Sequence, residues 1–143
     1  MTLPFCVACE QFEPRLYELA DGRFQLVEQG ALSPFMSGHR YLLTERPLAE
    51  FLKRVGLEGV QFEQAVIYDP LSKQEITTHT RIRVAQLFST EQIKDLNLRG
   101  PRLLLMNDEY YFVSPELKVL LEESSFTYLR FSEGLNGFAA SAA

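Results

Sequence analysis

Two cysteines and two histidines are the residues of this chain that could bind a metal ion. Cys6 and Cys9 form a Cys-x-x-Cys motif, a spacing that can present two thiolates to zinc. A structural zinc site needs four ligands, and the sequence contains two histidines, His39 and His79. These four residues are therefore the candidate zinc ligands. The alternative, which we favour, is a pair of partly buried free thiols and no bound cofactor.

The sequence lacks the patterns that usually mark a catalytic centre. A redox Cys-x-x-Cys motif starts a helix directly after a strand, and Pro4-Phe5 gives no strand signal. There is no glycine-rich phosphate loop, no Gly-x-Ser-x-Gly motif and no spacing of carboxylates that suggests an acid–base pair. His79 lies among threonines, where we expect a surface or hydrogen-bonded histidine. We therefore do not expect an enzyme.

Two segments have the composition of a protein-binding surface. Asp108, Glu109 and Tyr110 lie at the expected tip of a hairpin, where acids suit a basic partner and tyrosine offers a large contact area. Phe35 and Met36 are apolar residues inside a Ser-, Gly- and Pro-rich segment, 29–38, that we expect to be a loop. The alternatives are a solvated turn with an inward tyrosine and a loop that fills the edge of the core.

Length and composition indicate a folded domain. The chain has 143 residues, of which 46% are hydrophobic and 23% charged, and these are ordinary values for a globular protein. We expect a single globular domain over residues 1–133. The last ten residues, 134–143, are rich in small residues, and we expect them to form a flexible tail.

The charge balance points to a protein partner. The net charge is −5, from 14 basic and 19 acidic residues, which disfavours nucleic acid and suits a basic partner. Arg81, Arg83, Arg99 and Arg102 make only a thin basic patch. No apolar stretch approaches the ~20 residues that cross a bilayer, and the first residues do not resemble a secretory signal. We expect a cytoplasmic protein that does not bind membranes.

Hydrophobic periodicity predicts both strands and helices, whereas residues 1–13 show no clear pattern. We expect a hairpin around Asp21-Gly22, a long hairpin that pairs 60–68 with 76–84, and a third around Asn107-Asp108. A short helix is expected over 89–96. Two longer helices are expected before Gly56 and after Ser114, with Thr44 and Ser114 as their caps.

The two longer helices fall within similar stretches of sequence. Each stretch reads strand, hydroxyl cap, amphipathic helix and strand, from Tyr41 to Phe62 and from Tyr111 to Phe131. We interpret them as two copies of one strand–helix–strand unit that share a sheet. The predicted class is α+β, with a mixed, mostly antiparallel sheet and two main helices.

The second stretch also resembles a known family. The run Phe112-Val113-Ser114-Pro115-Glu116-Leu117-Lys118, with Leu120-Leu121 and then Leu129-Arg130-Phe131, resembles the C-terminal signature of immunity proteins from bacterial polymorphic-toxin systems. One branch is the double-CxxCG immunity proteins, whose first motif is similar to Cys6-Val7-Ala8-Cys9. Here Glu10 replaces the glycine of that motif and the second CxxC is absent. The resemblance is best over residues ~85–133.

This resemblance implies a small cytosolic protein that neutralises a cognate toxin by binding it. The net charge of the chain suits a basic toxin. A second hypothesis is a small metal-stabilised or ligand-binding regulatory domain. A third hypothesis is an enzyme whose site the sequence does not reveal. We expect a monomer or a homodimer joined through a strand edge.

Overall fold

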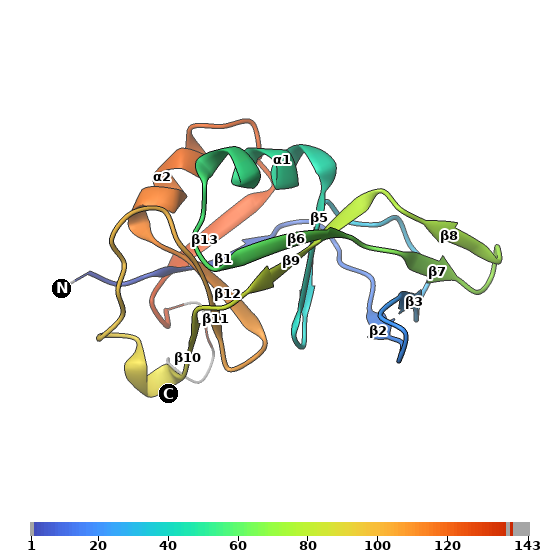
Figure 1. Cartoon of the computed structure of the whole chain (residues 1–143), viewed down its shortest axis with the longest axis horizontal. Coiled ribbons are helices and arrows are strands. Elements are labelled where there is room, and N and C mark those ends of the chain that lie inside the picture. Colours follow the sequence, from blue (N-terminus) through green and yellow to red (C-terminus); the bar gives the residue numbers. More distant parts are fainter. Residues whose placement is uncertain (1, 137, 139–143) are drawn as a thin grey trace.

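The computed structural model describes residues 2–136 and 138, and this part of the chain is an α+β fold (Figure 1). It contains thirteen strands, two α-helices and one short 3₁₀ helix, η1. The helices are α1 Arg46–Val55 and α2 Pro115–Glu122, and η1 is Thr90–Gln92. The strands are β1 Phe5–Cys9, β2 Leu16–Glu18, β3 Phe24–Leu26, β4 Phe35–Gly38, β5 Tyr41–Glu45, β6 Val60–Gln64, β7 Ile67–Asp69, β8 Gln74–Ile76, β9 His79–Val84, β10 Leu87–Phe88, β11 Leu103–Met106, β12 Tyr110–Val113 and β13 Leu129–Glu133.

The described strands form three sheets, which we call A, B and C. Sheet A has the order β10-β11-β12-β1-β13, sheet B the order β2-β3-β7-β8, and sheet C the order β4-β5-β9-β6. The pairs β10–β11 and β3–β7 are parallel, and the other pairs are antiparallel. The predicted α+β class with mixed, mostly antiparallel pairing is confirmed.

The long hairpin predicted from the alternation of 76–84 is present, and it spans two sheets. Its first half pairs β6 with β9 in sheet C, with Val60 opposite Val84. Its far half pairs β7 with β8 in sheet B, with Ile67 opposite Ile76. Between the halves Ala65 N donates to His79 O at 3.0 Å, so the second strand has one extra residue there. This bulge turns the hairpin from one sheet into the next.

The two predicted strand–helix–strand stretches are β5-α1-β6 and β12-α2-β13. They do not share a sheet: the first lies in sheet C and the second in sheet A, so that part of the prediction is wrong. In each stretch the helix joins two strands that flank one antiparallel strand, which is β9 in sheet C and β1 in sheet A. The internal repeat itself stays a prediction.

Of the two predicted caps, one is confirmed. Ser114 Oγ accepts a hydrogen bond from Leu117 N at 3.4 Å, and Pro115 takes the first helical position. Thr44 does not cap α1, because it lies inside β5 and Glu45 is the cap residue. Thr44 is fully buried, and its Oγ1 has no hydrogen-bond partner within the described structure.

The sequence pattern gave no indication of β1, yet this strand lies between β12 and β13 in sheet A. Val7 is 5% exposed and packs into the main core, while Cys6 packs on the opposite face of the sheet. The strand reads Phe-Cys-Val-Ala-Cys, a run with no charged residue and no alternation of polar and apolar types. Its position therefore could not be read from periodicity.

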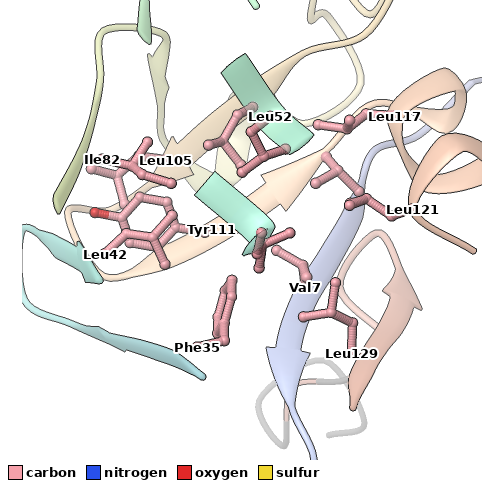
Figure 2. Packing of buried hydrophobic residues seen from close by; sticks show 13 residues of the cluster. Val7, Phe35, Leu42, Leu52, Ile82, Leu105, Tyr111, Leu117, Leu121 and Leu129 are labelled. Atoms are coloured by element: carbon pink, nitrogen blue, oxygen red, sulfur yellow. The ribbon is translucent and has the colours of Figure 1, made fainter. Parts of the chain in front are cut away.

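The main core lies between the helices and sheets A and C. Figure 2 shows side chains from both helices and both sheets packed against one another. Its buried members are Val7, Phe35, Leu42, Leu48, Leu52, Ile82, Leu103, Leu105, Tyr111, Val113, Leu117, Leu121 and Leu129. A second cluster, around Phe24 and Ile67, fills the space between sheets B and C.

A third apolar cluster lies on the other face of sheet A and includes part of the predicted flexible tail. Leu135 and Phe138 pack against Phe88, Leu104 and Phe112. The rings of Phe138 and Phe112 are stacked with centroids 6.1 Å apart. These two residues of the predicted tail therefore pack on sheet A, and 137 and 139–143 lie outside the described residues. The flexibility of 134–143 stays a prediction.

Candidate protein-binding surface

The β11–β12 hairpin ends in a tight turn built by Asn107 and Asp108. Both residues have positive φ, 53° and 62°, and the turn is closed by a hydrogen bond from Glu109 N to Met106 O at 3.1 Å. Asn and Asp tolerate this left-handed conformation better than other residues with a Cβ atom. Two consecutive residues of this kind make the turn that suits the twist of a hairpin. The hairpin predicted here is confirmed.

Contacts on both flanks hold the turn in place. On one side Asn107 Nδ2 donates to Thr90 Oγ1 of η1 at 3.0 Å. On the other side Arg40, in the β4–β5 turn, donates from Nη2 to Asp108 Oδ2 at 3.2 Å and from its main-chain N to Asp108 O at 2.7 Å. The tip is therefore fixed to two segments that are distant in the sequence.

The next two residues are held by this turn but project into solvent. Glu109 is exposed, and its side chain has no ion pair or hydrogen bond among residues 2–136 and 138. Tyr110 is 40% exposed, and its ring stands edge-on to Phe138 with centroids 4.7 Å apart. We call Asp108, Glu109 and Tyr110 the tip surface. It offers one free carboxylate and one positioned aromatic ring on a rigid support.

A hollow of about 280 Å³ lies beside the tip surface. Four of its seven lining residues are polar and three are apolar, and one of the apolar ones is Leu87 of β10, which is 59% exposed. Asp108 links the hollow to the tip surface, because it belongs to both. The lining residues are Leu87, Phe88, Ser89, Gln92, Leu105, Asn107 and Asp108.

Phe35 and Met36 do not belong to this surface. They lie in β4, which pairs with β5, and are only 3% and 1% exposed. Phe35 fills the main core and Met36 the second cluster. The expectation of an exposed contact loop is therefore wrong, because adjacent residues of a strand bury their side chains on opposite faces. The alternative interpretation, in which these residues fill the core, describes them correctly.

Cys6 and Cys9 do not face one another. Three residues apart in β1, their side chains point to opposite faces of sheet A. Burial in the third cluster raises the pKa of the Cys6 thiol to about 11. Cys9 instead packs against the main core, where its Sγ lies 3.2 Å from Ser33 Oγ. One ion cannot bind both thiols in this strand.

The two histidines also lie apart. His39 is exposed in the β4–β5 turn, whereas His79 is buried in β9. His79 Nε2 donates to Ser33 O at 2.8 Å and Nδ1 accepts from Thr78 Oγ1 at 2.9 Å, so both ring nitrogens are used. Burial lowers the pKa of His79. No group of three or more potential metal ligands occurs in the part of the chain that the structure describes, so the four candidate ligands do not form a zinc site.

Arg81 does not belong to the thin basic patch that the sequence predicts. It is 4% exposed and lies between sheets B and C. Its guanidinium lies 2.6 Å from Glu18 and 5.0 Å from the Phe24 ring centre, and it donates to Arg40 O at 3.1 Å. Through Arg40 this buried cation supports the turn that holds Asp108.

Another hollow, of about 460 Å³, is lined by 59–61 and 83–85. Arg83 is its one ionisable side chain, so this hollow lacks the pair of titratable groups that acid–base catalysis requires. No helix formed by the described residues has both the length and the hydrophobicity to span a bilayer. The chain matches no protein family, no curated protein and no solved structure.

Proposed function

We propose that the chain is an antitoxin-type immunity protein that binds and neutralises a cognate bacterial toxin through the tip surface. The observation that carries the proposal is the doubly anchored β11–β12 turn, which holds Glu109 and Tyr110 exposed in a fixed geometry. The sequence resemblance over residues ~85–133 includes this hairpin and the Ser114-capped helix that follows it.

A rigid tip favours binding for an energetic reason. Ordering a flexible loop on association costs free energy, and a loop that is already fixed avoids much of this cost. Tyr110 adds aromatic contact area, and Glu109 adds a charge that no neighbour neutralises within the described residues. The net charge of −5 speeds encounter with a basic partner and makes the association rate sensitive to salt.

Several finer expectations belong to the same proposal. The protein acts in the cytoplasm, as a monomer or homodimer, by covering the active site or substrate channel of the toxin, with no catalysis of its own. The two strand–helix–strand stretches are copies of one unit. This interpretation is supported by the arrangement that they share, in which each helix connects two strands that flank a third strand of the same sheet. Because Cys6 and Cys9 face opposite sides of a sheet, we do not favour the metal-stabilised alternative.

The test is co-expression of the chain with the product of the gene next to its own in the native genome. We expect that product to arrest bacterial growth, the chain to restore growth, and the two proteins to purify as a stable complex. A neighbouring product that is harmless, or that the chain neither binds nor neutralises, would falsify the proposal.

Two variants test the surface. Glu109→Lys and Tyr110→Ala should each weaken the complex at least about tenfold, since a contact at the centre of an interface is commonly worth that much. Glu123→Lys is the matched control, because Glu123 is an exposed acid at the end of α2, which Figure 1 shows on the opposite side of the sheets from the tip. It should bind the toxin as the unaltered chain does.

A further inference from the structure

The strand β10 lies at an edge of sheet A, beside the hollow. Leu105 N donates to Gln86 O at 3.0 Å, and Asn107 N donates to Phe88 O at 3.1 Å. Residues 86 and 88 therefore direct main-chain groups toward β11, and the residue between them directs its own groups away. Leu87 thus directs an N–H and a C=O to the side of β10 that no other described strand occupies, and its side chain is exposed.

The hollow next to this edge suits a long cationic side chain. Leu87 lines the hollow with a side chain that is 59% exposed and can cover the methylene groups of a lysine or arginine. Phe88 and Leu105 also line it, but they are only 5% and 6% exposed and pack in clusters on opposite faces of sheet A. Asp108 is another lining residue. Its Oδ2 accepts from Arg40, whereas Oδ1 accepts no hydrogen bond from any described residue. The hollow is therefore lined both by the exposed Leu87 side chain and by a carboxylate of which one oxygen has no hydrogen-bond partner among the described residues.

We propose that β10 and the hollow bind an extended segment of the partner protein, which pairs with the main chain of Leu87 and places a lysine or arginine side chain against Asp108. The inference rests on the proposed function, since it assumes that the partner is a protein, and it adds how that partner is recognised. Main-chain pairing at a sheet edge supplies affinity, and the side-chain hollow supplies specificity.

The surrounding charges favour a cation as the occupant. Glu109 and Glu91 are exposed acids that make no ion pair within the described structure, and both are close in sequence to residues that line the hollow. Arg40 is the cation already paired with Asp108, at 3.2 Å, and it is 68% exposed at its side chain. An incoming cation would share the carboxylate with Arg40, so the two compete for it. Removing Arg40 should therefore strengthen binding of the segment.

The first experiment uses the full chain and short peptides as probes. The probes are acetylated, amidated pentapeptides, Val-Thr-Xaa-Thr-Val, in which the central residue is arginine, lysine, glutamine or glutamate. We expect amide NMR shifts at 86–89 and 105–109, and affinities at least about tenfold higher for the cationic peptides than for the glutamate peptide. Equal affinities, or shifts confined to another part of the chain, would overturn the inference.

Variants separate the two elements of the proposed recognition. Asp108→Asn should reduce the preference for a cation, since Glu109 and Glu91 remain. Leu87→Pro should weaken all four peptides because it deletes the outward N–H without breaking a bond to β11. Leu87→Ala keeps that N–H and is the matched control for the backbone change. Arg40→Ala should tighten binding of the arginine peptide. If Asp108→Asn and Leu87→Pro bind every peptide as the unaltered chain does, the inference is wrong.

The toxin complex then distinguishes failure of this inference from failure of the proposed function. If the toxin is neutralised equally well by Leu87→Pro, Asp108→Asn and the unaltered chain, the proposed function stands and this inference fails. If the cationic peptides bind at β10 but the neighbouring gene product is not neutralised, the recognition mode stands and the immunity function fails. Loss of toxin protection in both variants, with their folds intact by NMR, supports the two together.

Discussion

Arg81 of β9 and Glu18 of β2 form the ion pair that joins sheet C to sheet B, with Arg81 Nη1 2.6 Å from Glu18 Oε2. The pair is asymmetric: the Arg81 side chain is 5% exposed and that of Glu18 is 38% exposed. Loss of Glu18 leaves the buried cation with only the more distant carboxylate of Glu63, 4.0 Å from Arg81 Nε, whereas loss of the arginine leaves an acid that water can reach.

We therefore predict that Glu18→Ala lowers the free energy of unfolding by about 2 kcal/mol in the unaltered chain. In an Arg81→Met background the same change should cost less than about 0.5 kcal/mol, because no buried charge is left behind. Urea unfolding of the four proteins measures the coupling between the two residues. Equal costs in the two backgrounds would show that the pair does not stabilise the fold.

A second prediction concerns Thr44, whose buried Oγ1 has no partner among the described residues. Thr44→Val replaces this hydroxyl with a methyl group of similar shape and should leave stability unchanged or raise it, by up to about 1 kcal/mol. The measurement is the midpoint of thermal or urea unfolding. A clear loss of stability would indicate that the hydroxyl is hydrogen-bonded in solution.

A contrasting prediction applies to Ser114, whose Oγ serves three groups. It accepts from Leu117 N at 3.4 Å and from Arg102 N at 2.8 Å, and it donates to Gly100 O at 2.7 Å. Ser114→Ala should lower the free energy of unfolding by about 2 kcal/mol, since it removes a helix cap and leaves buried main-chain groups unpaired. Ser114→Thr keeps the hydroxyl and should recover part of the loss. A neutral Ser114→Ala would argue against the cap.

A fourth prediction follows from the lowered pKa of His79, which burial causes. The unfolded chain has the ordinary pKa, 6.5, and therefore binds more protons than the folded chain as the pH falls below that value. The contribution of neutral His79 to the stability of the fold is complete above pH 6.5, and it is lost as the pH falls toward the lower pKa of the folded state. The free energy of unfolding should thus decrease on acidification through this window.

His79→Gln provides the comparison for that titration. Glutamine can still donate to Ser33 O but does not ionise, so the slope of stability against pH in this window should become smaller. Glu13 remains in both proteins and acts in the opposite direction, because burial raises its pKa above 4.5 and the folded state then binds more protons than the unfolded state as the pH falls. An unchanged slope between pH 6.5 and 5 would assign the titration to other groups.

A fifth prediction concerns the reactivity of Cys6. With a pKa of about 11 in place of 9.0, its thiolate fraction near neutral pH is about 100-fold smaller than that of an ordinary thiol. Cys6 should therefore resist N-ethylmaleimide in the native chain and react readily in urea, as peptide mass spectrometry can measure. Rapid native labelling of Cys6 would contradict its half-buried position in the third cluster.

Local sequence chemistry predicted the features that depend on neighbours along the chain. Asn107-Asp108 specifies the tight turn, Ser114-Pro115 starts α2, and the alternation of 76–84 gives the long hairpin. The acids and the tyrosine of the tip surface could also be identified, because they are neighbours along the chain at the expected turn. The residues that hold this surface in place could not be identified, because Arg40 comes from another hairpin and Thr90 from η1.

The wrong predictions have a common physical origin: a second layer of the structure covers a strand face that the sequence suggests is exposed. The sequence places Arg81 in a thin basic patch, but sheet B covers its side chain. Phe35 and Met36 lie in a segment with a loop-like composition, yet each is buried in a different cluster. Periodicity shows which residues share a face, but not whether a second layer covers that face.

The position of β1 between β12 and β13 in sheet A has a consequence for folding during synthesis. Phe5 pairs with Glu133 on one side and with Val113 on the other, so this strand leaves the ribosome more than a hundred residues before its neighbours exist. Contacts this distant in sequence slow folding and leave an apolar strand exposed in the interval. Nascent chains that end before residue 129 should therefore engage chaperones, and release should coincide with emergence of β13.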